Sequence, residues 1–368
     1  MIKILIAAGG TGGHIYPALA IADELARLEP SAQIEFAGTA HGLENKIIPS
    51  KGYHLHHLPI GRLNSNVALS ERLKTLLLLP FALLKSFFLI LRLKPDFVLG
   101  VGGYASGPVL LVAALLNRRT AIWEPNAMPG MANRILSRFV NECWVVFAEA
   151  KAHLHNSHLK NVGMPVRREI EDMSQAPGGV TAADGLFRLL VFGGSQGARG
   201  INNAMVEVIR QNPDWAKRIR LVHQTGPTDF ARIREAYGQQ VGNVELKEYL
   251  DDMAKRYAWA DLVICRSGTG TLSELAACGK PAILIPFPFA SDDHQMKNAE
   301  SLVQKGAAEM ILQPQLSVEG LKAAIDRLSQ DAPARLQMAS KIRAFHQPHA
   351  GEKLARLILE RVSSNAAS

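Results

Sequence analysis

Cysteine is scarce in this sequence of 368 residues, which holds three Cys with no paired spacing among them. The spacing argues against a disulfide framework or a cysteine-based zinc site, and it favours a reducing compartment. Aromatic residues are also few, at 6%, and they form no stripe interleaved with basic residues. Because no nucleic-acid motif occurs either, we expect no nucleic-acid partner.

The sequence also lacks a signal-peptide pattern and a long uninterrupted apolar run. Its apolar start, Ile2–Ala8, has no basic region before it and runs straight into glycines, so we expect a first strand there. The most apolar segment, Leu76–Leu91, is shorter than the about 20 residues of a spanning helix and is broken by Pro80 and Lys85. We therefore expect no transmembrane span.

Two interpretations of Leu76–Leu91 remain open. It is either a buried crossover helix or an exposed apolar patch that docks on anionic lipid, and one packed face with one free face would satisfy both. The cations that flank it are Arg72, Lys74, Arg92 and Lys94. The net charge is +8, and residues 1–162 hold 16 Lys and Arg against 10 Asp and Glu. A basic first half suits anionic lipid or a pyrophosphate substrate.

Short apolar runs alternate with amphipathic helical segments along the whole chain. In the first such segment, Ala18, Ile21, Ala22 and Leu25 recur with the period of one helix face. Alternation of strand and helix predicts an α/β fold with parallel sheets. The runs expected to form strands are Ile2–Ala8, Gln33–Ala37, Phe97–Val101, Thr120–Trp123, Cys143–Phe147, Arg188–Phe192, Arg220–His223, Asn243–Lys247, Asp261–Cys265, Ala282–Ile285 and Ala308–Leu312.

The same pattern of strand, glycine turn and helix occurs near the start of each half of the chain, which predicts two lobes. Leu5–Gly13 reads LIAAGGTGG and Leu189–Gly197 reads LLVFGGSQG, each an apolar strand, a glycine turn and a helix. We expect an N-terminal lobe at 1–163 and a C-terminal lobe at 164–345. A last helix at about 346–364 is expected to fold back onto the first lobe.

Glycine turns that follow a strand and enter a helix are the main chemical signal. Such a turn aims bare backbone N–H groups and the positive helix end at one point, which suits phosphate or carbohydrate. Gly9–Gly13, Gly193–Gly197 and Gly100–Gly107 all have this form, although a tight turn that binds nothing explains any single one. A nicotinamide fingerprint fits poorly, because Ile15 stands where a third glycine is needed and Gly38-Thr39 where an acidic residue is needed.

Three side chains beside these turns are candidates for chemistry. His14, at the start of the first helix, is either a base or a plain helix-end contact. Glu274, in a Gly/Thr turn that enters a helix, either grips the two hydroxyls of a ribose or is a solvated helix carboxylate. Arg167, at the crossing between the lobes, either faces a diphosphate or is an ordinary surface residue.

Two groups of histidines have a superficial likeness to metal ligands. They are His54, His56 and His57, and His153, His155 and His158. Neither group has an acidic or cysteine residue nearby in the sequence. We therefore expect solvated or half-buried histidines, and no metal site.

Eight motifs occur in a fixed order over nearly the whole chain. They are GGTGGH at Gly9–His14, GGYASGP at Gly102–Pro108, EPN at Glu124–Asn126, MPVR at Met164–Arg167, GGSQGA at Gly193–Ala198, YLDDM at Tyr249–Met253, the turn at Ser267–Glu274, and DDHQ with NA within Asp292–Ala299. As a set they resemble the MurG family of UDP-N-acetylglucosamine–lipid I N-acetylglucosaminyltransferases.

The resemblance implies a fold of the glycosyltransferase B type, with two Rossmann-like parallel-sheet lobes and a cleft between them. It implies inverting transfer of N-acetylglucosamine from UDP-N-acetylglucosamine to the 4-hydroxyl of lipid I, which forms lipid II in peptidoglycan synthesis and so serves cell-wall biogenesis, cell shape and cell division. No tightly bound cofactor and no metal are implied. The implied location is peripheral, on the cytoplasmic face of the bacterial cell membrane. The partners would be the donor, the polyprenyl-pyrophosphate-linked acceptor, an anionic membrane surface and other cell-wall enzymes.

The resemblance also assigns roles to residues. The donor-binding set is Thr11, Gly12, Gly13, Asn126, Arg167, Ser195, Leu250, Thr269, Gly270, Thr271, Leu272, Ser273, Glu274 and Gln295. Within it, Leu250 would meet uracil through its backbone, Glu274 would hold the ribose, and Arg167 would face the diphosphate. The acceptor-binding set is Gly102, Gly103, Tyr104 and Ser106. The candidate base is His14, with Glu124 as the second choice.

Two positions depart from the family pattern. Trp123 stands where the family often has His, and Met164 stands where it often has Asn. Neither change removes an assigned residue. Two other functions stay open at this point: another UDP-sugar enzyme of the same architecture, such as a natural-product glycosyltransferase or a UDP-N-acetylglucosamine epimerase, and a lipid- or nucleotide-binding module without catalysis.

Overall fold

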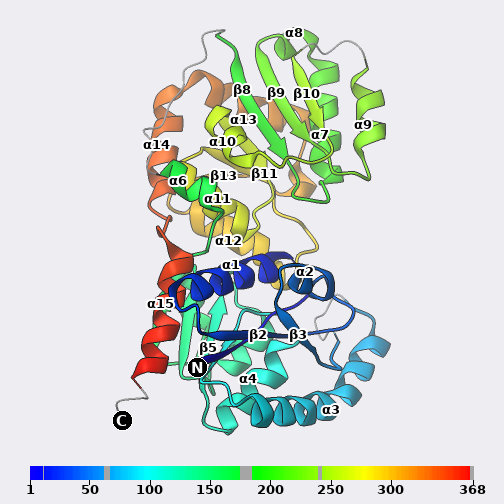
Figure 1. The fold of residues 1–368 in the computed structure, drawn as a ribbon. Coiled ribbons are helices and arrows are strands. Elements are labelled where there is room, and N and C mark those ends of the chain that lie inside the picture. The colour runs from blue at the N-terminus through cyan, green and yellow to red at the C-terminus, as the bar shows by residue number, and fades with distance from the viewer. Residues whose placement is uncertain (11, 62–66, 175–184, 239–242, 365–368) are drawn as a thin grey trace. The chain divides into compact units, whose positions relative to one another are not determined.

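A computed structural model describes residues 1–10, 12–61, 67–174, 185–238 and 243–364 (Figure 1). The chain divides into two compact units, each formed by more than one segment. Unit 1 comprises Met1–Val166, Ser291–His294 and His349–Ser368, and unit 2 comprises Arg167–Ala290 and Gln295–Pro348. The chain passes between them first at Val166–Arg167, where the sequence suggested a boundary at 163–164.

Unit 1 is built on a seven-stranded sheet in the order β3-β2-β1-β4-β5-β6-β7. Every neighbouring pair is parallel. The central strands are buried on both faces, as strands between two helical layers must be, and this explains their uninterrupted apolar runs. The strands are β1 Lys3–Ala7, β2 Gln33–Gly38, β3 His54–His57, β4 Phe97–Gly100, β5 Arg119–Glu124, β6 Glu142–Val145 and β7 Leu159–Asn161.

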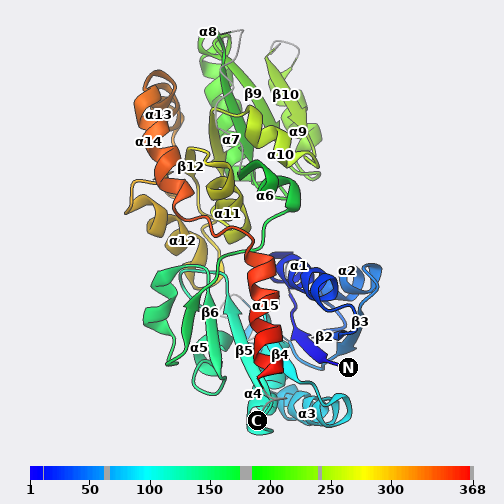
Figure 2. The same cartoon turned by 60° about the vertical axis from the view of Figure 1, so that its left-hand side comes forward.

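Helices cover both faces of this sheet. One core joins the sheet to α1 and α15, and the opposite core joins it to α3 and α4. Figure 2 shows α15, from the end of the chain, lying alongside α1. The helical elements of unit 1 are α1 Gly12–Leu28, α2 Glu44–Ser50, α3 Leu69–Leu93, α4 Ser106–Leu115, α5 Met131–Leu136, η1 Ala148–His153, η2 Ser291–Asp293 and α15 Ala350–Ser363.

Unit 2 repeats the plan with a six-stranded parallel sheet in the order β10-β9-β8-β11-β12-β13. One face carries a core shared with α7, α9 and α13. On the other face, Tyr257 of α10 packs its ring against Phe192 of β8. The strands are β8 Phe187–Phe192, β9 Ile219–Gln224, β10 Val244–Lys247, β11 Leu262–Cys265, β12 Ala282–Leu284 and β13 Glu309–Met310.

The helices of unit 2 alternate with these strands. They are α6 Arg168–Ser174, α7 Arg199–Gln211, α8 Pro213–Ala216, α9 Phe230–Tyr237, α10 Met253–Trp259, α11 Thr269–Cys278, α12 His294–Val303, η3 Gln313–Gln315, α13 Val318–Gln330 and α14 Ala332–Arg343. Two parallel-sheet α/β units confirm the predicted fold class. Each of the eleven predicted apolar runs contains or overlaps an observed strand, whereas β3 and β7 were not predicted.

The apolar segment predicted at Leu76–Leu91 lies within α3. Its buried residues, among them Ala82, Ser86 and Ile90, recur with helical period and pack toward unit 1. Over its most apolar window this helix is 22% buried, and in the described part of the chain it is the one helix long and apolar enough to cross a membrane. It is thus not a fully buried crossover helix: one face is packed and the other is exposed.

Candidate active site

Two glycine turns of unit 1 interlock at the carboxyl ends of β1 and β4. Gly10, Gly102 and Gly103 have φ of 94°, 97° and 83°, the left-handed region that favours glycine. A Cβ on Gly103 would lie 2.1 Å from the carbonyl oxygen of Gly9. The turns can therefore approach this closely because both are made of glycine, and together they form one backbone surface.

His14 is held between these turns. Its Nδ1 lies 2.9 Å from the carbonyl oxygen of Val101. Because a carbonyl accepts hydrogen bonds, Nδ1 carries the proton and Nε2 keeps the lone pair in the neutral ring. Burial lowers the pKa of His14, and the neighbouring His294 lowers it further, against the opposing effect of the bond to Val101. A neutral imidazole with a fixed tautomer can accept a proton at Nε2.

Glu44 holds the first glycine turn in place, a role that no sequence pattern indicated. Its fully buried carboxylate accepts hydrogen bonds from the backbone N–H of Gly10, at 3.0 Å, and from the backbone N–H and hydroxyl of Thr39, at 2.9 and 2.6 Å. An acidic residue was sought at the end of the second strand, where Gly38-Thr39 stands. The chain instead returns the carboxylate of Glu44 to that point, five residues later in the sequence than Thr39.

Glu124, the second choice for the base, holds a loop. Its buried carboxylate accepts from the backbone N–H groups of Asn126 and Gly130, at 2.9 and 3.1 Å, and from the side-chain amide of Asn133, at 2.9 Å. Burial raises the pKa of Glu124, while these hydrogen bonds act in the opposite direction. The group therefore fixes the loop that carries Asn126, and its geometry suits this better than proton transfer.

The residues predicted to bind the acceptor lie around the second of the interlocked turns. Tyr104 is half-buried, and its ring lies against Gly10. Ser106 is fully buried at the start of α4, with its hydroxyl 2.9 Å from the carbonyl oxygens of both Ala7 and Gly102. The hydroxyl of Ser106 thus ties the turn to β1.

The glycine turn of unit 2 follows β8 and leads into α7. Gly194 and Gly197 have φ of 86° and 76°, and a Cβ on Gly197 would lie 1.8 Å from the carbonyl oxygen of Thr225. Ser195 stands exposed on this turn. The turn therefore places the exposed hydroxyl of Ser195 near the amino end of a helix, where an anion is favoured.

Glu274 lies in α11 and is linked to two other side chains of unit 2. The hydroxyl of Tyr257 donates to its carboxylate at 3.0 Å, and Nε of Arg167 lies 3.5 Å from its other oxygen. Burial raises the pKa of Glu274, and Arg167 and Tyr257 act in the opposite direction. The structure thus brings together the two residues predicted for the ribose and the diphosphate, and it adds Tyr257, which the sequence motifs did not single out.

The amino ends of α11 and α12 are joined side by side. The hydroxyl of Ser267 donates to the carbonyl oxygen of Gln295 at 2.7 Å, and the amide of Asn298 donates to the hydroxyl of Thr269 at 3.1 Å. The side chain of Gln295 accepts from the backbone N–H of Phe287 at 3.0 Å. Two helix ends therefore converge at residues of the predicted donor-binding set.

The other predicted donor residues fall in the same elements. Gly12 and Gly13 begin α1, residues 269–273 form the first part of α11, and Leu250 is buried between β10 and α10. Thr11 lies outside the described residues. The predicted site residues therefore form two half-sites, one in each unit, both at the carboxyl ends of parallel strands, where α/β folds bind ligands.

His54 and His56 were expected to form no metal site because no acidic residue is nearby in the sequence, but they have an acidic neighbour in three dimensions. Glu35, which precedes His54 by 19 positions, lies beside both histidines across the β2–β3 pair. This cluster is separate from the two half-sites.

Comparison with known proteins gives consistent matches in both halves. The glycosyltransferase family 28 N-terminal domain matches residues 4–145, and the family 28 C-terminal domain matches residues 188–354. The chain is 48% identical to the UDP-N-acetylglucosamine--N-acetylmuramyl-(pentapeptide) pyrophosphoryl-undecaprenol N-acetylglucosamine transferase of Bdellovibrio bacteriovorus, over 97% of this chain and 99% of that protein. It is 41% identical to the enzyme of the same name from Myxococcus xanthus, over 98% and 93%. The crystal structure of Acinetobacter baumannii MurG matches with a TM-score of 0.81 and 29% identity, over 98% of this chain and 100% of that one.

Proposed function

We infer the function of this protein from its family, because the chain belongs to glycosyltransferase family 28 and, within it, to the MurG family. The protein is a glycosyltransferase that moves N-acetylglucosamine from UDP-N-acetylglucosamine to lipid I and forms lipid II. The observation that carries this is a relative 48% identical over nearly the full length of both chains. An epimerase or a natural-product transferase is not favoured.

For the donor, we propose that unit 2 binds the nucleotide. The carboxylate of Glu274 accepts hydrogen bonds from the ribose hydroxyls, and the backbone of Leu250 contacts uracil. Arg167 and Ser195 face the diphosphate together with the amino ends of α7 and α11. These helix ends and the guanidinium stabilise the negative charge that develops on UDP as it leaves, without requiring a metal ion. The donor is already activated at its anomeric carbon, so the transfer needs no tightly bound cofactor.

For the acceptor, we propose that the interlocked glycine turns of unit 1 bind the pyrophosphate of lipid I. This role is supported by the backbone surface that the two turns form, which hydrogen bonds to Glu44 and from Ser106 hold in place. The acceptor 4-hydroxyl attacks the anomeric carbon from the face opposite UDP, through an oxocarbenium-like transition state, so the configuration inverts. Nε2 of His14 takes the hydroxyl proton, because its lone pair is kept available by the bond from Nδ1 to Val101.

For the location, we propose peripheral binding to the cytoplasmic face of the cell membrane through α3. The exposed side of α3 carries Leu77, Phe81 and Phe88, at 75%, 64% and 60% exposure, and the cations Lys74 and Lys85 are exposed beside them. The opposite side packs against α4 and supplies Ile90 and Leu93 to the core, so a spanning orientation would break unit 1. Supply of lipid II at this surface would serve cell shape and division, alongside other cell-wall enzymes.

A transfer assay tests the proposed function. Purified protein is mixed with UDP-N-acetylglucosamine and lipid I, and the lipid product is measured by mass spectrometry. We expect a lipid heavier by one N-acetylglucosamine and stoichiometric release of UDP. The same donor without acceptor should remain unchanged, whereas an epimerase would isomerise it. Binding of UDP without any lipid product would contradict catalysis.

A further inference from the structure

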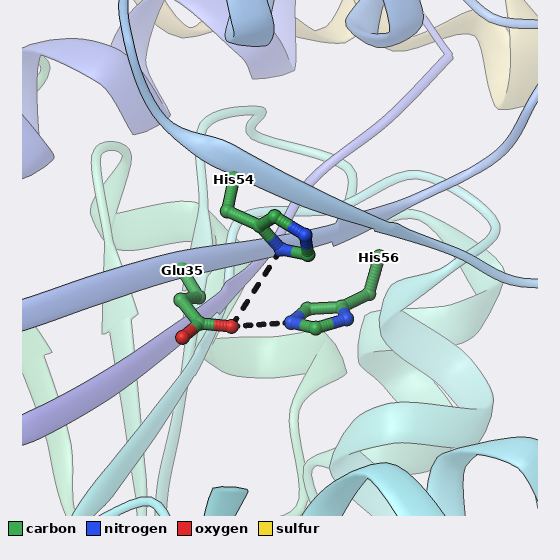
Figure 3. A group of neighbouring side chains, drawn as sticks. All are labelled: Glu35, His54 and His56. Atoms are coloured by element: carbon green, nitrogen blue, oxygen red, sulfur yellow. Dashed lines mark hydrogen bonds and ion pairs between the residues drawn. The ribbon is translucent and has the colours of Figure 1, made fainter.

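An edge of the sheet in unit 1 carries a cluster of ligating side chains that the transferase reaction does not use. Glu35 on β2 and His54 and His56 on β3 lie together, with their functional groups turned toward one another (Figure 3). Their carboxylate oxygen and ring nitrogens all lie within 4.8 Å of one another. Two imidazoles and one carboxylate form a recognised set of ligands for zinc.

The cluster follows from the register of two parallel strands. Glu35 is paired with His54, and Ala37 is paired with His56. Paired residues of adjacent strands project from the same face of a sheet, and residues two apart on one strand share a face. All three ligating side chains are therefore fixed on one face by the backbone, while His57 projects to the other.

The side chains already contact one another. One oxygen of Glu35 is hydrogen-bonded to Nε2 of His56 and lies 3.7 Å from Nδ1 of His54. The rings of His54 and His56 meet edge to face, with their centroids 4.4 Å apart. The carboxylate of Glu35 is 14% exposed and His54 is 67% exposed, so the cluster has a sheltered floor and an open side through which an ion can enter.

We propose that Glu35, His54 and His56 bind a divalent transition metal ion of the zinc type. In a tetrahedral site with bonds of about 2.0–2.1 Å, ligand atoms are roughly 3.3 Å apart, so side-chain rotations alone would bring these three to an ion. A water molecule would take the fourth position. Imidazole ligands favour zinc, cobalt or nickel over magnesium and calcium, which prefer oxygen.

The bound ion would cross-link two strands of the sheet at a distance from the glycine turns of the proposed active site. Glu35 is level with Leu5 of β1, four residues before Gly9, or about 13 Å along the strand. The ion would join the edge strand β3 to β2, and a ligand that binds the folded state stabilises it. The proposal therefore predicts a gain in thermal stability and does not depend on the transferase activity.

The test is a zinc competition titration on protein without a polyhistidine tag. Zinc chloride is added against a chromophoric chelator, and one ion per chain is expected to be withdrawn from the chelator. Glu35→Gln, His54→Ala and His56→Ala should each weaken zinc binding at least tenfold. His57→Ala is the matched control, since His57 is on the same strand and its Nε2 is hydrogen-bonded to Asn45. This control should bind zinc as the wild type does.

A second measurement distinguishes loss of zinc binding from poor folding of a variant in which a buried side chain is replaced. His54 is exposed, so His54→Ala should fold normally. One equivalent of zinc should raise the melting temperature of the wild type and of His57→Ala, and should leave that of His54→Ala unchanged. Cobalt in place of zinc should give the intense visible absorption of a tetrahedral site. Wild-type zinc affinity in all three ligand variants, or loss of binding in His57→Ala instead, would overturn the proposal.

Discussion

At the scale of single residues, three carboxylates near the half-sites differ in what surrounds them. Glu44 and Glu124 each accept several hydrogen bonds from turn backbone and neighbouring side chains. Glu274 has the hydroxyl of Tyr257 at 3.0 Å and Arg167 at a looser 3.5 Å. A carboxylate has about four acceptor positions, so Glu274 keeps capacity for a ligand that brings its own donors, as a ribose does.

The first prediction concerns Glu274. Glu274→Gln should weaken UDP binding by about 1.5–3 kcal/mol, since it removes charge-assisted hydrogen bonds to the ribose hydroxyls. Calorimetric titration with UDP alone measures this. Tyr257→Phe is the comparison, because it removes a partner of Glu274 but keeps the carboxylate, and it should cost less. Unchanged UDP affinity in a folded Glu274→Gln protein would refute the assignment.

The second prediction concerns His14. His14→Ala should lower kcat by roughly 10²–10⁴ with little change in UDP affinity, because a positioned base contributes about that much. In the wild type, burial lowers the pKa of His14 below its usual 6.5, so activity should be retained down to that value and lost as pH falls through the lowered pKa. Steady-state kinetics with varied lipid I and pH measure both.

The rival role for His14 gives a different pattern. If the ring shapes the turn or touches the acceptor pyrophosphate, His14→Ala should raise the acceptor KM, and turnover should recover at saturating lipid I. His14→Gln, which can still donate to the carbonyl oxygen of Val101, helps to separate these roles. Normal turnover in that variant would exclude proton transfer by residue 14.

Sequence patterns identified some residues of the half-sites and missed others. The glycine turns and the Ser267–Glu274 turn could be found because backbone geometry demands glycine and a helix start at fixed spacing. Glu44, Tyr257 and Val101 could not, because each acts through a contact between segments distant in sequence or through its carbonyl oxygen. Assignment of the donor and acceptor residues came from family resemblance and stays a prediction.

At the scale of elements, the strands divide by burial. The predicted apolar runs all contain or overlap observed strands, and most of these strands lie inside a parallel sheet, where a strand is covered on both faces and must be apolar. The two strands that were not predicted, β3 and β7, are the edges of the sheet in unit 1 and read HLHH and LKN. An edge strand is partly solvated and needs no apolar run, and hydrophobic periodicity revealed the edge strands β10 and β13 of unit 2 but missed β3 and β7.

The third prediction concerns the exposed face of α3. Replacing Leu77, Phe81 and Phe88 together by Ser should reduce binding to anionic vesicles at least tenfold, because these side chains are exposed in the protein and available to lipid. Sedimentation with vesicles measures the change, and UDP binding should be unaffected. Leu336→Ser on α14, at 71% exposure, is the control and should bind vesicles normally.

The basic residues beside this face predict a salt effect. Each Lys near an anionic surface contributes about 1 kcal/mol, which salt screens. Lys74→Gln with Lys85→Gln should therefore weaken vesicle binding and reduce its dependence on ionic strength. Release of the protein from membranes by detergent alone, and not by salt or alkaline washing, would contradict peripheral binding.

At the scale of the whole molecule, unit 1 is completed by a segment from the other half of the sequence. Leu354, Ala355 and Ile358 of α15 are fully buried in the core that contains α1 and β1. The last helical stretch was expected to fold back onto the first lobe, but periodicity alone does not say where a helix packs. Helix α15 is therefore part of the core of unit 1.

The fourth prediction concerns this helix. Leu354→Ala or Ile358→Ala should destabilise unit 1 by about 2–5 kcal/mol, the usual cost of a cavity left by a buried aliphatic side chain. Hydrogen exchange should show faster exchange of the amides of β1, β4 and α1, with β8 and β11 unchanged. Lys353→Ala, at an exposed position of the same helix, should leave both sets unchanged. Equal loss of protection in both sheets would contradict the division into two units.

The position of α15 has a consequence for biosynthesis. A ribosome releases residues 1–166 first, but the core of unit 1 lacks Leu354, Ala355 and Ile358 until α15 has been synthesised. At about 5–20 residues per second, roughly 10–40 s pass between the synthesis of residue 166 and that of α15. During that interval the apolar face of α1 that α15 will cover is exposed to solvent or to a chaperone. A stalled ribosome or a truncated mRNA would therefore yield a chain that has both glycine turns of unit 1 but an incomplete core.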